Sequence, residues 1–283
     1  MVKKITLLDG AVGTSLWAIA EKNGVEKDPV WTYNMEHPEF VLQLANEFMD
    51  AGAEIVLANT FGANGIAVSR SPYSVKDVVS TGVKLAKQAR GTRNVKICLS
   101  AGPLPKLMEP YGDLEEDEVE KLYREQLSAG MEQGPDMILL QTFIDLEMMK
   151  VATRVAKEFG VPVFCSMSFL KVGKTLMGQS VTDVINGLEP MGIDAIGLNC
   201  SIGPALAVPV IREFHEKTKL PLIFKPNAGT PISSLDGKTT IPYSPDMFVS
   251  EIRPVLDVVD YVGGCCGCDA TYVSVLRDEL QGR

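Results

Sequence analysis

Two adjacent cysteines near the C-terminus are the residues of this sequence best suited to chemistry. They lie in the stretch Val262-Gly263-Gly264-Cys265-Cys266-Gly267-Cys268. Glycine reaches backbone conformations closed to other residues, so Gly263 and Gly264 could turn both sulfurs toward one point. Thiolate sulfur suits zinc, and a catalytic zinc takes about three protein ligands and keeps a fourth position open. The alternative is a pair of buried thiols that fit a tight turn.

A third sulfur is available in Gly197-Leu198-Asn199-Cys200-Ser201. The adjacent cysteines do not have the C-x-x-C spacing of many zinc sites, so spacing alone is a weak indication of metal binding. Whether Cys200 can join Cys265 and Cys266 depends on the elements that carry them.

The overall composition is that of an ordinary globular protein, with 46% hydrophobic and 22% charged residues in a chain of 283. No composition break or low-complexity linker appears, so we expect a single domain over residues 1–283. The net charge of −9 argues against a nucleic-acid partner. No apolar stretch approaches the ~20 residues of a membrane span, and the N-terminal apolar run is too short for a signal peptide. We therefore expect a cytoplasmic protein without a membrane partner.

Short apolar strands alternate with amphipathic helices along the whole chain. Eight such units can be counted, with strands near residues 5–8, 54–58, 95–99, 137–140, 161–165, 195–198, 222–224 and 257–262. This rhythm predicts an α/β fold, a (β/α)₈ TIM barrel, with an open doubly wound sheet as the alternative. Closure of a barrel would bring the first and last strands side by side.

The unusual polar and sulfur-bearing residues follow the C-terminal ends of these strands. In a (β/α)₈ barrel those ends form one face, which carries the active site. The sixth and eighth strands both neighbour the seventh, so their three cysteines could converge at one rim. The residues expected at this face are Asp9, Asn59, Thr60, Gln141, Asn199, Cys200, Asn227, Cys265 and Cys266.

At these positions the chain resembles the homocysteine S-methyltransferase family. That family includes betaine and S-methylmethionine enzymes and the homocysteine-binding module of cobalamin-dependent methionine synthase. The resemblance rests on motifs spread over nearly the whole chain in the family order. They are Leu8-Asp9-Gly10-Ala11-Val12-Gly13-Thr14, Ala58-Asn59-Thr60-Phe61-Gly62-Ala63-Asn64, Gly197-Leu198-Asn199-Cys200, Pro226-Asn227-Ala228-Gly229 and Gly263-Gly264-Cys265-Cys266-Gly267.

The resemblance implies that Cys200, Cys265 and Cys266 hold Zn²⁺ and that homocysteine binds at the open position as a thiolate. A free thiol is mostly protonated at neutral pH, whereas zinc deprotonates a coordinating thiol. Methyl transfer to that sulfur would give methionine. The methyl donor would be betaine, S-methylmethionine or a separate methyl-corrinoid protein. A barrel that binds zinc without catalysis is an alternative from another class.

The expected substrate-binding residues are Asp9, Asn59, Thr60, Gln141, Asn199, Asn227 and Trp31. Asp9 could neutralise the homocysteine ammonium, although it could instead cap a turn or a helix. Trp31 could face a cationic methyl donor, and packing is an equal alternative.

Two positions depart from the family pattern. Gln141 stands where the family usually has Glu, which leaves open a relative that acts on another thiol. Cys268 follows the cysteine pair where the family commonly has Thr, and it is a spare thiol, a fourth ligand or a redox-sensitive neighbour.

Overall fold

Eight parallel strands form the central barrel of the computed structural model, which describes residues 3–229, 232–233, 239–240 and 242–283. The strands are β1 (Thr6–Leu7), β2 (Ile55–Leu57), β3 (Lys96–Ala101), β4 (Met137–Phe143), β5 (Val163–Met167), β6 (Ala195–Asn199), β7 (Leu222–Lys225) and β10 (Tyr261–Val262). Their order is β1-β10-β7-β6-β5-β4-β3-β2, and a parallel bridge between Leu8 and Ile55 joins the two ends of the sheet. The prediction of a (β/α)₈ barrel is confirmed.

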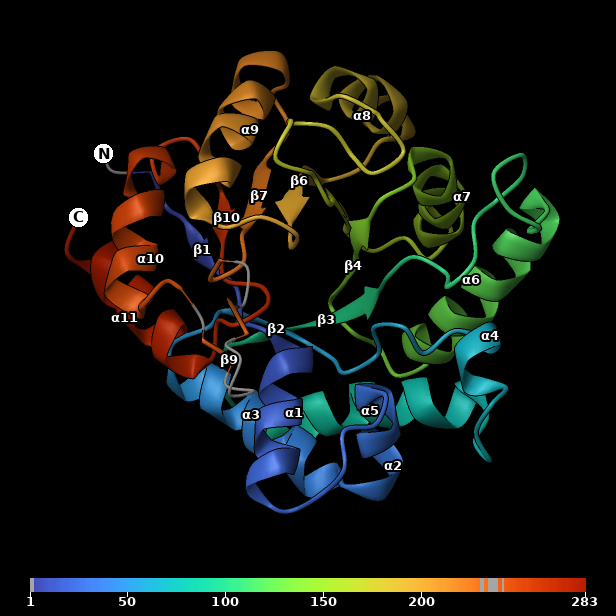
Figure 1. Cartoon of the computed structure of the whole chain (residues 1–283). Coiled ribbons are helices and arrows are strands. Elements are labelled where there is room, and N and C mark those ends of the chain that lie inside the picture. Colours follow the sequence, from blue (N-terminus) through green and yellow to red (C-terminus); the bar gives the residue numbers. More distant parts are fainter. Residues whose placement is uncertain (1–2, 230–231, 234–238, 241) are drawn as a thin grey trace.

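Helices surround the strands, as Figure 1 shows. They are α1 (Val12–Lys22), α2 (Tyr33–Glu36), α3 (Pro38–Asp50), α4 (Gly65–Val68), α5 (Val75–Arg90), α6 (Glu116–Met131), α7 (Leu146–Lys157), α8 (Val181–Leu188), α9 (Pro204–Lys217), α10 (Pro245–Ile252) and α11 (Ala270–Gln281). Several of these helices begin at side-chain caps. Ser180 and Asp183 form a capping box at α8, and Ser244 caps α10 ahead of Pro245.

Two separate apolar cores hold this arrangement. The larger lies between the strands and the helices. The smaller contains nine buried side chains, among which Ile55 and Leu57 on β2, and Met137 and Leu139 on β4, alternate along their strands. Because successive strand residues point to opposite faces, these side chains fill the interior of the barrel. Their packing fixes the strand ends on which the polar residues sit.

Some boundaries differ from the sequence-based prediction. The last barrel strand is Tyr261–Val262 only, because the preceding residues form turns rather than a strand. Helix α1 directly after β1 was not predicted. A small antiparallel hairpin, β8 (Ile232–Ser233) with β9 (Thr239–Thr240), follows β7. Among the described residues, no helix is both long and apolar enough to cross a membrane.

Candidate active site

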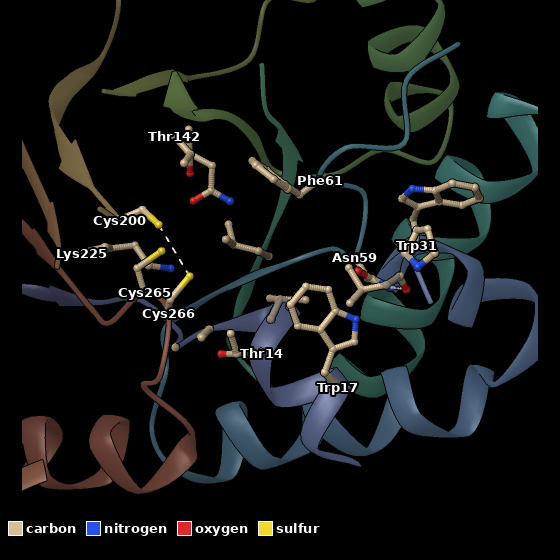
Figure 2. A pocket seen from close by; sticks show the side chains of 18 residues that line it. Thr14, Trp17, Trp31, Asn59, Phe61, Thr142, Cys200, Lys225, Cys265 and Cys266 are labelled. Carbon is tan, nitrogen blue, oxygen red and sulfur yellow. Dashed lines mark hydrogen bonds between the residues drawn. The ribbon is translucent and has the colours of Figure 1, made fainter. Parts of the chain in front are cut away.

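Three cysteine sulfurs meet at the C-terminal face of the barrel. Cys200 directly follows β6, and Cys265 and Cys266 follow β10, while β7 pairs with both strands. The three Sγ atoms lie within 4.8 Å of one another, and those of Cys200 and Cys266 are 3.6 Å apart (Figure 2). The convergence expected from strand order is present in the structure.

Backbone hydrogen bonds fix the cysteines against the end of β7. The Cys200 N–H donates to the Lys225 carbonyl at 3.1 Å, and the Cys265 N–H donates to the Pro226 carbonyl at 2.8 Å. Cys200 and Ser201 have φ angles of 62° and 60°. Left-handed conformations are uncommon for residues other than glycine and are concentrated at functional sites. The fold therefore holds Cys200 in a conformation that its own preferences disfavour.

The glycines beside the cysteine pair serve a different purpose from the one expected. Gly263 and Gly264 do not have positive φ; the left-handed glycine of this stretch is Gly267, at φ 86°. A Cβ on Gly263 would lie 2.6 Å from the Asp9 carbonyl oxygen, and one on Gly264 would lie 2.3 Å from the Cβ of Cys268. These two positions need glycine because no space exists for a side chain.

The three thiols share protons unequally. The pKa of Cys200 falls to about 3 because Cys265 and Cys266 hydrogen bond to its sulfur. The same contacts with Cys200 raise the pKa of Cys265 to about 12 and that of Cys266 further. The set consists of one thiolate and two thiols whose protons a metal can displace. Three such sulfurs suit zinc with an open fourth position.

A cavity of about 350 Å³ opens beside the sulfurs. It is mostly apolar, and in Figure 2 the cysteines lie on one side and the aromatic rings of Trp17 and Trp31 on the other. Its described lining consists of Gly10, Ala11, Val12, Gly13, Thr14, Trp17, Pro29, Val30, Trp31, Leu57, Asn59, Phe61, Gln141, Thr142, Cys200, Lys225, Cys265 and Cys266. A small organic molecule in this cavity would reach the sulfurs.

Asp9 lies away from the cavity surface. It is completely buried, and its Oδ1 accepts a hydrogen bond from Lys225 Nζ at 2.5 Å while Oδ2 accepts one from the Leu57 N–H at 2.7 Å. Burial raises the pKa of the Asp9 carboxyl, and the charge and hydrogen bond of Lys225 act in the opposite direction. The carboxylate expected to meet a substrate ammonium is thus already paired within the protein.

Three of the expected binding residues lie on the β2–β4 side of the site. Gln141 lines the cavity and donates from Nε2 to the Ser100 hydroxyl at 2.7 Å. Asn59 also lines it, and its amide donates to the Val30 carbonyl at 2.7 Å. Thr60 does not line it; its hydroxyl donates to the Ser100 carbonyl at 2.7 Å, which ties β2 to β3.

The remaining two asparagines support the cysteines. Asn199 is buried, and its amide donates to Thr142 Oγ1 at 2.7 Å and toward the Cys265 sulfur at 3.7 Å. Asn227 is buried, and its side chain beside Cys200 helps to lower the pKa of that thiol. Neither belongs to the described cavity lining, so both lie beside the cysteines rather than at the cavity surface.

The structure adds residues that the sequence reading did not single out. Trp17, on α1, forms part of the cavity wall and is 39% exposed, and Phe61 follows β2 beside it. Lys225 ends β7, and its position at a strand end was the available signal. Cys268 is fully buried and does not belong to the sulfur cluster. A fourth-ligand role for Cys268 has no support from this geometry.

The sequence is similar to known methyltransferases along most of its length. It is 27% identical to methionine synthase of Mycobacterium tuberculosis over 96% of this chain and 24% of that protein. It is 28% identical to betaine–homocysteine S-methyltransferase 1 of Xenopus tropicalis over 92% of this chain and 70% of that protein. The chain therefore spans about a quarter of the methionine synthases that it matches.

Solved structures give the same architecture. The metallated form of the homocysteine methyltransferase MmuM from Escherichia coli superposes with a TM-score of 0.81 at 19% identity, covering 98% of this chain and 96% of that one. This similarity concerns the fold. The sequence model of homocysteine S-methyltransferases matches residues 6–280, which is nearly the whole chain. The chain belongs to the homocysteine S-methyltransferase family.

Proposed function

We propose that this chain methylates the sulfur of homocysteine, giving methionine, at a zinc ion held by Cys200, Cys265 and Cys266. The observation that carries the proposal is the convergence of three cysteine sulfurs within 4.8 Å beside a cavity of about 350 Å³. Zinc, when bound, would supply the positive charge that keeps an acceptor thiol deprotonated at neutral pH. Membership of the family and its named relatives supports homocysteine as the first acceptor to test.

The protein's own residues prepare the site for this reaction. Asn199, whose amide nitrogen lies 3.7 Å from the Cys265 sulfur, would help to orient that ligand. A donor bound against the apolar wall of the cavity would displace water from the acceptor, which strengthens electrostatic interactions inside. Trp17, Trp31 and Phe61 line the cavity with aromatic rings, which suit a trimethylammonium or sulfonium donor. We propose betaine, S-methylmethionine or a methyl-corrinoid protein as the donors to compare.

The test combines metal analysis with product formation. Purified protein should contain about one zinc per chain and should form methionine from homocysteine with at least one of the three donors, measured by mass spectrometry. Cys265→Ser should lose most of the zinc and the methionine. Cys268→Ser is the matched control, because Cys268 is adjacent in sequence but outside the sulfur cluster. Full zinc retention in a Cys200→Ser/Cys265→Ser/Cys266→Ser variant would contradict the proposal.

A further inference from the structure

The charges around the cavity are unusual for a site that receives an amino acid. Among the eighteen lining residues that the structure describes, none is Asp or Glu, and Lys225 is the one Lys, Arg or His. An α-amino acid carries an ammonium as well as a carboxylate. The cavity lining therefore offers formal charge to only one of these two groups.

The Asp9 carboxylate, which lies outside the described lining, does not supply the missing negative charge. Asp9 is 0% exposed, and both its oxygens are used, one by Lys225 Nζ and the other by the Leu57 N–H. Turning Asp9 toward a ligand would leave Lys225, which is 1% exposed, buried without its partner. Uncompensated buried charge is strongly unfavourable, so Asp9 stays with Lys225.

The polar groups near β2 and β4 are neutral. Asn59 and Gln141 line the cavity, and the Gln141 amide nitrogen already donates to the Ser100 hydroxyl. Their carbonyl oxygens could accept hydrogen bonds but carry no negative charge. An ammonium moved from water to this apolar surface would lose hydration without gaining an opposite charge, and such transfers are costly.

Groups that attract an anion are present at the end of β7 and the start of α1. Lys225 Nζ donates to Asp9 and, within the part of the chain that the structure describes, to no other group, whereas an ammonium has three donors. Residues Gly10 to Thr14, including the first turn of α1, line the same cavity. The N-cap residue, Ala11, makes no side-chain capping bond, so the first-turn N–H groups keep their capacity for an anion at the positive end of the helix dipole.

We infer that the acceptor class is short mercapto-carboxylic acids, recognised through the thiol and the carboxylate, and that an α-amine adds nothing to binding. The inference rests on the proposed function and makes homocysteine one member of the class rather than its defining member. The carboxylate of the acceptor would meet Lys225 and the start of α1, both of which line the cavity.

Three thiols separate the two charged groups. Homocysteine carries both, 4-mercaptobutyrate is homocysteine without the amine, and 3-mercaptopropylamine is homocysteine without the carboxylate. Their binding to zinc-loaded protein is measured by isothermal titration calorimetry at one pH. We expect 4-mercaptobutyrate to bind at least as tightly as homocysteine, and 3-mercaptopropylamine to bind at least tenfold more weakly than either.

A substitution at Gln141 tests the same reasoning from the protein side. Gln141→Glu places a carboxylate in the cavity and should raise the preference for homocysteine over 4-mercaptobutyrate at least tenfold. Gln141→Met, of similar size and without charge, should leave that preference unchanged. The comparison of the three thiols on the unaltered protein does not depend on either variant folding.

The outcomes distinguish the inference from the proposed function. If homocysteine binds the unaltered protein more than tenfold more tightly than 4-mercaptobutyrate, an ammonium site exists and the inference is overturned while thiol activation stands. If none of the three thiols binds zinc-loaded protein, the inference and the proposed function both fail.

Discussion

Replacing Lys225 by methionine should destabilise the protein in a way that depends on pH. Lys225 and Asp9 form an ion pair with 1% and 0% side-chain exposure, and the Nζ–Oδ1 distance is 2.5 Å. In Lys225→Met the Asp9 carboxyl stays buried without its cation. Breaking one partner of a buried pair typically costs about 3–5 kcal/mol. Protonation of the carboxyl limits that cost, because neutralising an aspartate at pH 7 against an ordinary pKa near 3.9 takes about 4.2 kcal/mol.

The direction of the pH effect follows from Asp9. Burial already raises the pKa of its carboxyl, and Lys225 supplies the two largest effects that lower it. Without Lys225 the folded-state pKa rises further above the unfolded value, so the folded variant binds a proton that the unfolded chain has lost. Stability is then retained at low pH and lost as pH rises, by up to about 1.4 kcal/mol per pH unit, between the unfolded and folded pKa values.

Urea unfolding of both proteins from pH 5 to pH 8 measures this effect. The stability difference between the unaltered protein and Lys225→Met should widen with pH. The double variant Asp9→Asn/Lys225→Met removes both charges and should recover at least half of the loss, because a buried pair as a unit contributes little net stability. A difference that does not change with pH, or a double variant less stable than Lys225→Met, would refute the reasoning.

Two further predictions concern the sulfur cluster. Zinc binding at pH 7 should release about two protons per chain, because the lowered pKa of Cys200 leaves it ionised while Cys265 and Cys266 have raised pKa values. Calorimetry in buffers of different ionisation enthalpy measures the number of protons released. Release of no protons would contradict this protonation scheme. Gly264→Ala should cost about 1–3 kcal/mol and lower the zinc content, since its Cβ would lie 2.3 Å from the Cβ of Cys268. Gly13→Ala, whose Cβ meets nothing within 4 Å, is the control in urea unfolding, and equal stability losses in the two variants would count against the steric explanation.

The sulfur cluster could be predicted because barrel topology is a simple rule. Once eight strand–helix units are recognised, β6 and β10 must both neighbour β7. The cysteines that directly follow β6 and β10 are therefore brought to the same part of the rim. The same rule placed Gln141 and Asn59 at the cavity. Strand order determines which strand ends lie side by side, and the number of strand–helix units determines the strand order of a barrel.

The Asp9–Lys225 pair could not be predicted in this way. The two residues are 216 positions apart, and β10 lies between their strands. Leu7, Val262 and Phe224 pair across β1, β10 and β7. The residue after Val262 is Gly263, which has no side chain to separate Asp9 from Lys225. Whether a polar residue at a strand end turns to the cavity or to a partner depends on such side-chain packing, which strand order does not contain.

Trp17 was missed for a different reason. It lies inside α1, and that helix begins three residues after Asp9 without a side-chain cap, so the usual start signal was absent. Its ring reaches the cavity because α1 lies against the open face of the barrel.

The place of Cys265 and Cys266, directly after the last barrel strand, has a consequence for synthesis of the chain. Cys200 leaves the ribosome 66 residues before Cys266, which is roughly 3–13 seconds at about 5–20 residues per second. During that interval the nascent chain has one of the three sulfurs, and β1 has no β10 to pair with. Assembly of the sulfur cluster and closure of the barrel therefore both require the segment from Tyr261 to Cys266. A chain that stops before Tyr261 would have an open sheet and only one of the three cysteines of the cluster.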